Sequence, residues 1–235
     1  MLHKTKGLSL HHYKYSESSV IAKIFTSDFG LLSFFINGIR QKKSKNKLGF
    51  LQPFTFLNLE ISYKSKSKLS RIKEMTPYKI HYIISRDINR QLISIFVSEV
   101  LLKVLIEGEK DIPLFCFLEG VANDLECNLE IPNIYPLKFL LDLSKFLGFL
   151  PSKLNSTLPY FDLLNGCFSK IGSEHNYYIN GDDLNFFKSI LFNKNESIPK
   201  SYRKKILLIL LDYYKLHHHE LKNLKSFKVI EDLGK

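Results

Sequence analysis

The sequence predicts an α+β chain of two modules, a five-stranded β-barrel at the N-terminus followed by an all-α helical domain. Hydrophobic residues alternate with a period of two as far as about Tyr78 and then recur with a helical period. Charge changes at the same place, because residues 1–80 hold 15 Lys and Arg against 4 Asp and Glu, whereas residues 81–235 hold 19 of each. A chain of 235 residues is long enough to bury two separate cores.

Five strands are expected in the first module. They span Gly7 to Tyr13, Val20 to Thr26, Leu31 to Ile36, about residues 54–61, and Leu69 to Met75. The turn residues from Ser27 to Gly30 join the second and third strands as a hairpin. Five short strands in about eighty residues suit a closed barrel of the OB type, although periodicity leaves an SH3-like barrel open. We place this domain at residues 1–79.

Helical runs fill the second module, which we place at residues 80–235. The predicted helices run from Leu92 to near Gly108, Pro113 to Leu125, Pro136 to Leu147, Asp183 to Phe192 and Tyr202 to His218. Between about residues 151 and 180 the helical period lapses, and two prolines and two glycines indicate an irregular insert. This module is therefore expected to be an all-α bundle with one irregular insert.

The composition of the chain argues against a metal site, a bound cofactor and export from the cell. Cys116, Cys127 and Cys167 are scattered and odd in number, so we expect reduced cysteines, no zinc and no cofactor. No apolar run approaches the ~18 residues of a membrane span. The N-terminus lacks the apolar stretch of a signal peptide, so a cytoplasmic protein is expected.

No enzyme machinery is visible in the sequence. There is no phosphate-binding glycine loop, no nucleophile elbow and no cysteine beside a suitable histidine. The carboxylates of Glu107, Glu109 and Asp111 flank a helix end, where solvation explains them. Residues 217–219 are three consecutive histidines, but on a helix they point about 100° apart and cannot converge on one ion. We therefore expect a binding protein rather than an enzyme.

Two basic segments of the barrel indicate a polyanionic partner. The first holds Arg40, Lys42, Lys43, Lys45 and Lys47, and the second holds Lys64, Lys66 and Lys68, followed by Arg71 and Lys73. Cations along such loops can follow a phosphate backbone and release its counterions. Nucleic acid is the polyanion that this pattern favours, with an anionic membrane surface or a merely solvated loop as alternatives.

Aromatic residues are interleaved with these cations, as is typical of proteins that bind single strands. On the second strand Val20, Ala22 and Ile24 would face the core, while Lys23 and Phe25 would face out. We expect Lys23 to join the DNA-binding cations, and Phe25 and Phe54 to be the exposed rings on which bases stack.

Several motifs, in order along almost the whole chain, resemble the RecO family of bacterial recombination and repair mediators. They are Lys6-Gly7, residues 15–19 (YSESS), residues 25–30 (FTSDFG), residues 38–40 (GIR), residues 51–54 (LQPF), residues 139–151 (FLLDLSKFLGFLP), residues 213–217 (YYKLH) and residues 224–230 (LKSFKVI). Each motif alone is weak, whereas the ordered set is specific.

The resemblance implies an OB-fold followed by a helical domain, and no catalysis. It implies binding of single- and double-stranded DNA, strand annealing, contact with the acidic tail of single-strand-binding protein, and partnership with RecR to load RecA on gaps. It also implies a nucleoid-associated protein. Arg203, Lys204 and Lys205 could receive that tail. Many family members carry a four-cysteine zinc module after the motif at residues 147–151, but here only Cys167 follows, so aromatic packing is expected to hold the insert.

Three other interpretations compete with a mediator. An RNA-binding OB protein would share the charge and the rings. A nuclease would use the carboxylates with a divalent metal, and a scaffold would use the basic face to dock an acidic protein. Annealing of coated DNA, metal-dependent cleavage and binding at low salt distinguish them.

Overall fold

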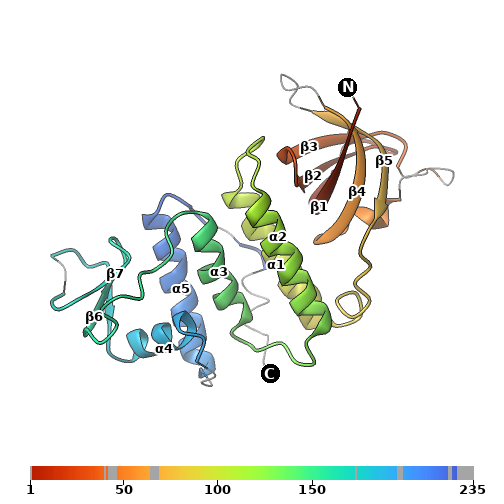
Figure 1. Cartoon of the computed structure of the whole chain (residues 1–235). Coiled ribbons are helices and arrows are strands. Elements are labelled where there is room, and N and C mark those ends of the chain that lie inside the picture. Colours follow the sequence, from red (N-terminus) through yellow and green to blue (C-terminus); the bar gives the residue numbers. More distant parts are fainter. Residues whose placement is uncertain are drawn as a thin grey trace. The chain divides into compact units, whose positions relative to one another are not determined.

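A computed structural model describes residues 2–39, 41, 47–63, 69–172, 174–194, 198–221 and 224–226. Their contacts form two compact units, Met1–Leu129 and Glu130–Lys235, and each unit is described by itself (Figure 1). No helix among these residues is long and apolar enough to cross a membrane.

A five-stranded closed barrel forms the first part of the first unit. Its strands are β1 (Leu2–Lys14), β2 (Val20–Thr26), β3 (Gly30–Ile36), β4 (Thr55–Ser62) and β5 (Ser70–Pro77), in the order β1-β2-β3-β5-β4. A short 3-10 helix, η1 (Leu48–Leu51), precedes β4. The parallel pairing of Phe34 with Ser70 and of Phe35 with Arg71 joins β3 to β5. The predicted five-stranded barrel of OB type is confirmed.

Alternate residues of the strands fill the barrel interior. Val20, Ala22 and Ile24 are fully buried there, as the alternation predicts. Gly7 belongs to the same interior, because a Cβ at this position would lie 2.6 Å from Cδ1 of Leu59 and 2.8 Å from Cγ2 of Ile24. The second strand therefore has its predicted orientation, and the motif Lys6-Gly7 has a packing reason for its glycine.

Two helices cover part of the outer barrel surface, and this corrects the prediction for Phe25. They are α1 (Ile88–Val104) and α2 (Ile112–Cys127). Phe25 does face out of the barrel, but its ring lies 5.8 Å from that of Phe115 on α2 and is fully buried. Phe54 is 4% exposed, with its ring 5.7 Å from that of Phe56. The expectation that Phe25 and Phe54 are exposed is wrong. Strand alternation does not reveal that a helix covers Phe25, and Phe54 packs against Phe56 of the barrel.

Arg90 fastens the two helices together. It is 5% exposed, and its guanidinium donates hydrogen bonds to the backbone oxygens of Leu125, Asn128 and Leu129 at the end of α2. These carbonyls have no partner within their own helix, so the arginine satisfies them. The predicted division at residues 79/80 follows the change from strands to helices, whereas the contacts group α1 and α2 with the barrel.

The second unit combines three helices with a small sheet. The helices are α3 (Tyr135–Phe146), α4 (Gly181–Leu191) and α5 (Lys200–Leu216). The insert at 151–180, predicted to be irregular, contains β6 (Tyr160–Asp162), β7 (Cys167–Ser169) and β8 (Tyr178–Asn180) in the order β7-β6-β8. Strands of three residues are too short to show a period in the sequence, which explains the difference.

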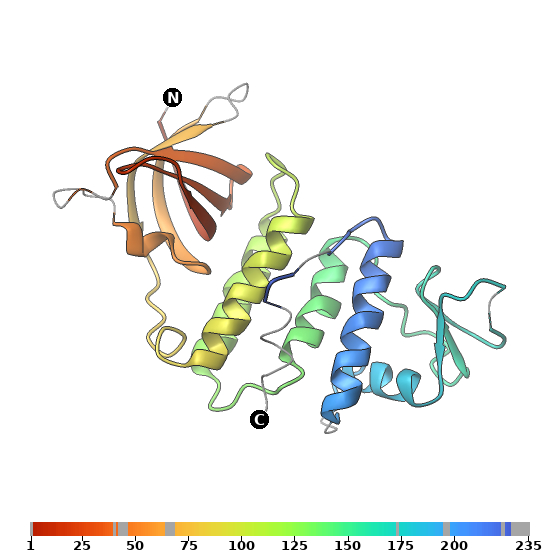
Figure 2. The same cartoon turned by 180° about the vertical axis from the view of Figure 1, so that it is seen from behind.

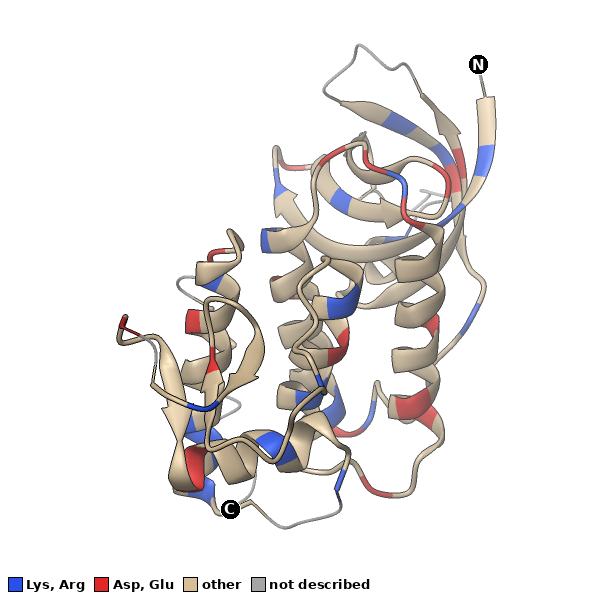
Figure 3. Ribbon diagram, turned by 60° about the vertical axis from the view of Figure 1, so that its left-hand side comes forward, with Lys and Arg blue, Asp and Glu red and all other residues tan. Residues whose placement is uncertain are grey.

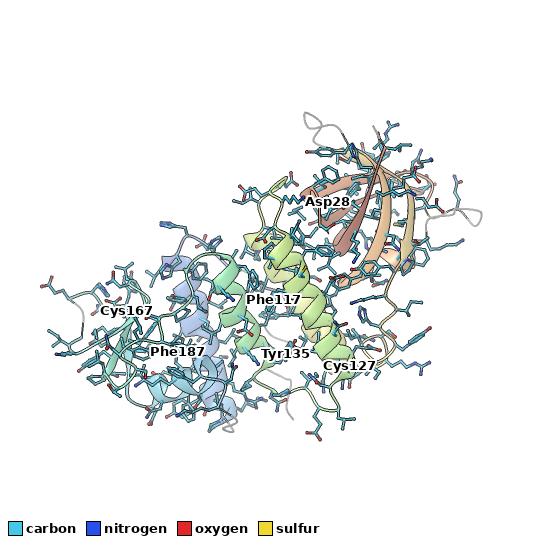
Figure 4. The ribbon with its side chains drawn as sticks, viewed as in Figure 1. Asp28, Phe117, Cys127, Tyr135, Cys167 and Phe187 are labelled. Carbon is cyan, nitrogen blue, oxygen red and sulfur yellow. The ribbon has the colours of Figure 1, made fainter. Side chains whose placement is uncertain are left out.

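Aromatic side chains hold this insert, as predicted. The Phe161 ring lies 5.0 Å from that of Phe168 on β7 and 4.9 Å from that of Phe187 on α4, a residue labelled in Figure 4. The buried carboxylate of Asp162 accepts hydrogen bonds from the backbone N–H groups of Leu164 and Asn165, at 2.8 and 3.0 Å. The carboxylate thus fixes the turn between β6 and β7.

Candidate nucleic-acid interface

Most of the predicted DNA-binding cations belong to the two loops that join β3 to β4 and β4 to β5. Arg40, Lys42, Lys43, Lys45, Lys64, Lys66 and Lys68 lie outside the described residues. Lys47 and Arg71, which border these loops, are exposed. The ammonium of Lys73 lies 2.8 Å from a carboxylate oxygen of Glu60, and Lys23 forms an ion pair with Glu107. The described cations of the barrel are thus partly neutralised, with Lys and Arg beside Asp and Glu (Figure 3).

Two exposed and two half-buried rings lie on the outer surface of the barrel, at the end of β1 near the first hairpin. Strand register places Tyr13 beside Ile21, Ile21 beside Phe35, and Phe35 beside Arg71, so that one row crosses β1, β2, β3 and β5. Tyr13 is 51% exposed and Tyr15 is 65% exposed. The aromatic patch is defined as His11, Tyr13, Tyr15 and Phe35.

The rings of the aromatic patch contact one another edge to face. The His11 and Tyr13 ring centroids are 4.4 Å apart, and those of Tyr15 and Phe35 are 5.4 Å apart. Each pair therefore leaves ring surface available to solvent while its partner restricts the ring's orientation. Bases of a single strand stack on such rings, each stacked base contributing about 1–3 kcal/mol.

The surroundings of the aromatic patch match the way OB-folds hold oligonucleotides. These folds bind them on the surface of strands 2 and 3, between the loop joining strands 1 and 2 and the loop joining strands 4 and 5. Here Tyr15 lies in the first of these loops, and the second contains Lys64, Lys66 and Lys68. Exposed Arg71, the register partner of Phe35, supplies a cation at the patch itself.

Two known domains account for nearly the whole chain. The family model for the N-terminal domain of recombination protein O matches residues 1–81, and the model for its C-terminal domain matches residues 85–226. The chain belongs to the RecO family. Proteins named DNA repair protein RecO from Flavobacterium psychrophilum and Phocaeicola vulgatus are 35% and 31% identical to it, over 98% and 99% of both chains. The resemblance seen in the sequence motifs is confirmed, and it ties the chain to DNA repair and recombination.

Tyr13 and Tyr15 of this RecO-family barrel are candidate interface residues that were not predicted from the sequence. A signal was present, since the alternation Tyr13-Lys14-Tyr15 directly precedes the first hairpin connection. Exposure could not be inferred from it, because rings with the same alternation elsewhere in the barrel are covered by α2.

A second outer surface of the barrel suits a polyanion less well. An open groove of about 620 Å³ crosses β1, β4 and β5 and includes Lys4, Lys6, Glu60 and Glu74. Lys6 forms an ion pair of 3.5 Å with Glu119, and the pKa of Glu60 is lowered by its hydrogen bond from Lys73. Charges of both signs alternate in this groove, so a phosphate backbone would meet carboxylates along its length.

The predicted partner-binding cations lie in the first half of α5. Lys204 is exposed and Arg203 is half-buried. Lys205 donates to a carboxylate oxygen of Asp183 at 2.6 Å, and this bond raises the pKa of Lys205. Lys205 is therefore already engaged by α4, whereas docking of an acidic peptide at these residues stays a prediction.

Metal-ligating residues do not cluster in the described parts of the chain. No three His, Cys, Asp or Glu side chains there lie close enough together to hold an ion. His217 instead stacks on Phe149 with ring centroids 5.0 Å apart, and its ring nitrogen lies 3.2 Å from the Leu163 oxygen. The expectation of a chain without zinc stays a prediction for elemental analysis.

Proposed function

We propose that this chain is a recombination mediator that binds single-stranded DNA on the aromatic patch and brings complementary strands together for annealing. The observation that carries the proposal is the row of Tyr13, Ile21, Phe35 and Arg71 across β1, β2, β3 and β5, in which Tyr13 and Arg71 are exposed and Ile21 and Phe35 are half-buried. The rings hold bases without sequence preference, and the loop cations reduce repulsion between two phosphate backbones.

The proposal extends to the partners expected of a RecO-family mediator. Single-strand-binding protein would be displaced from DNA as this chain binds, with its acidic tail docking on the helical unit near Arg203, Lys204 and Lys205. RecR would act with the chain to load RecA on the exposed strand. Residues 81–235 hold 19 acids and 19 bases, and this balance supports protein contacts, rather than DNA contacts, for the predicted helical domain. Catalysis has no part in this function.

Binding of fluorescent poly-dT oligonucleotides by Tyr15→Ala tests the proposal. Loss of one stacked base should weaken binding about 5- to 150-fold, the equivalent of about 1–3 kcal/mol. Tyr82→Ala is the matched control, because Tyr82 is 60% exposed in the same unit but lies beyond β5. Equal affinities of the two variants would refute the aromatic patch as the binding surface.

Annealing of oligonucleotides coated with the cognate single-strand-binding protein tests the mediator role. The wild-type chain should accelerate annealing, and RecR should alter that rate. Preference for RNA oligonucleotides with no annealing would favour an RNA-binding protein, and cleavage that requires a divalent metal would favour a nuclease.

A further inference from the structure

The segment joining α1 to α2 lies beside the barrel (Figure 2), where its Glu107 contacts Lys23 on β2 and bridges to Leu31 on β3. Among the described residues, β3 pairs with β5 only at Phe34 and Phe35. Nearer the start of β3, Leu31 instead forms a β-bridge with Glu107. The Gly108 N–H donates to the Leu31 oxygen at 3.0 Å. This backbone pairing holds residues 106–109 on the barrel.

Gly30 permits the close approach of this segment. A Cβ at Gly30 would lie 2.1 Å from the carbonyl oxygen of Glu109, and the φ of Gly30 is +68°. A second attachment is the ion pair of 3.7 Å between Lys110 and Asp28, a residue labelled in Figure 4. Backbone contacts and an ion pair thus fix the position of the segment that carries Glu107.

The Glu107 carboxylate binds two polar side chains on the outer barrel surface. Its carboxylate accepts hydrogen bonds from the Lys23 ammonium and, at 2.9 Å, from the Ser33 hydroxyl. Lys23 pairs with Ser33 on β3 and with His11 of the aromatic patch on β1, and this row lies two residues along the strands from the row of Tyr13, Ile21 and Phe35. An ammonium and a hydroxyl side by side are donors that a phosphate would otherwise use.

We propose that Glu107 is a fixed acidic stop that sets the extent of the DNA-binding surface, occupying Lys23 and Ser33 in place of a phosphate. A strand bound on the rings of Tyr13, Tyr15 and Phe35 meets this carboxylate at the row of His11, Lys23 and Ser33, so it ends or turns away there. This inference rests on the proposed function. It explains why Lys23, a predicted DNA contact, is committed to an internal ion pair.

Glu107→Gln tests the inference by freeing Lys23 for a phosphate. One additional contact should steepen the log–log salt dependence of single-strand binding by about 0.7 and tighten binding about fivefold at 0.1 M salt. Glu109→Gln is the matched control, because it makes the same charge change two residues further along the same segment. Glu107→Gln combined with Lys23→Gln should return the salt slope to the wild-type value.

The length dependence of binding provides a second measurement. Affinity for a series of poly-dT oligonucleotides should stop rising at a shorter length for the wild type than for Glu107→Gln. Identical salt slopes and identical plateaus for Glu107→Gln and Glu109→Gln would overturn the inference. Tyr15→Ala, measured in the same assay, separates this inference from the proposed function. If Tyr15→Ala binds single strands as tightly as the wild type, the proposed function itself is refuted. Thermal melts of each variant verify that the barrel remains folded.

Discussion

Two pairs of tyrosines have opposite surroundings. One pair is Tyr13 and Tyr15 in the barrel unit, and the other is Tyr213 and Tyr214 in the helical unit. The first two are at least half exposed, with rings against His11 and Phe35. The hydroxyls of Tyr213 and Tyr214 each donate at 2.6 Å to a backbone oxygen, of Phe149 and of Leu140, and burial raises the pKa of both phenols. A buried tyrosine with a satisfied hydroxyl stabilises a fold, while an exposed ring beside a cation offers a surface to a ligand.

Truncation of a buried tyrosine gives the largest expected effect on stability. Tyr214→Ala should lower the free energy of unfolding by about 3–5 kcal/mol, because it removes a fully buried aromatic side chain. Tyr15→Ala should change that free energy by less than about 0.5 kcal/mol, as is usual for surface substitutions. Urea denaturation followed by circular dichroism measures both. An equal decrease in the free energy of unfolding of both variants would contradict the difference between the two tyrosine pairs.

Replacing the cations of the β3–β4 connection tests whether the loops act with the exposed rings. Changing Arg40, Lys42, Lys43, Lys45 and Lys47 to Ala should make the log–log salt slope shallower by roughly 3 units, if about four of them contact phosphates. The control removes the same charge from five exposed lysines on the helices and the insert, Lys103, Lys138, Lys145, Lys170 and Lys215. A slope that shifts equally in both variants would show a general effect of net charge.

Phe25 is a barrel aromatic that should behave like the buried rings of the helical unit. Phe25→Leu keeps an apolar side chain against Phe115 and should cost less than about 1.5 kcal/mol of stability. Its affinity for single strands should equal that of the wild type, because the ring has no exposed surface. Weaker binding with an intact fold would return Phe25 to the DNA interface.

The smallest expected effect concerns Asp28, at the attachment of the α1–α2 connection. The pKa of its carboxyl is lowered, chiefly by the hydrogen bond of 2.7 Å from the Thr5 hydroxyl. Because the folded-state pKa lies below the unfolded one, this stabilisation is present above about pH 4 and is lost as pH falls through the folded-state pKa. Thr5→Val should raise the pKa toward 3.8, as an NMR titration would detect. An unchanged titration would exclude Thr5 as the cause.

Much of the fold could be predicted from the sequence because its signals are local. Alternation gave Val20 to Thr26 as a strand, and a helical period ending before Gly108 gave α1. The contacts between elements could not be predicted this way. Burial of Phe25 depends on Phe115, ninety residues further along the chain, and the pairing of Lys23 with Glu107 depends on a segment after α1.

The candidate interface was predictable in its charge but not in its rings. Lysine-rich loops are visible as composition, whereas exposure of Tyr13 and Tyr15 depends on where the helices leave the barrel uncovered. The strands β6, β7 and β8 were missed for a different reason. Each has three residues and is stabilised by packing of Phe161, with no periodic pattern of its own.

Photocrosslinking tests the aromatic patch most directly. A poly-dT oligonucleotide carrying 5-iododeoxyuridine forms covalent bonds on irradiation with aromatic side chains that stack on the modified base. Trypsin separates Tyr13 from Tyr15, because it cleaves after Lys14, so mass spectrometry can assign each ring. We expect crosslinks on both tyrosines of the wild-type chain. In Tyr15→Ala, the crosslink at position 15 should disappear. Crosslinks confined to residues 130–235 would contradict the account, because they would place the bound strand on the helical unit.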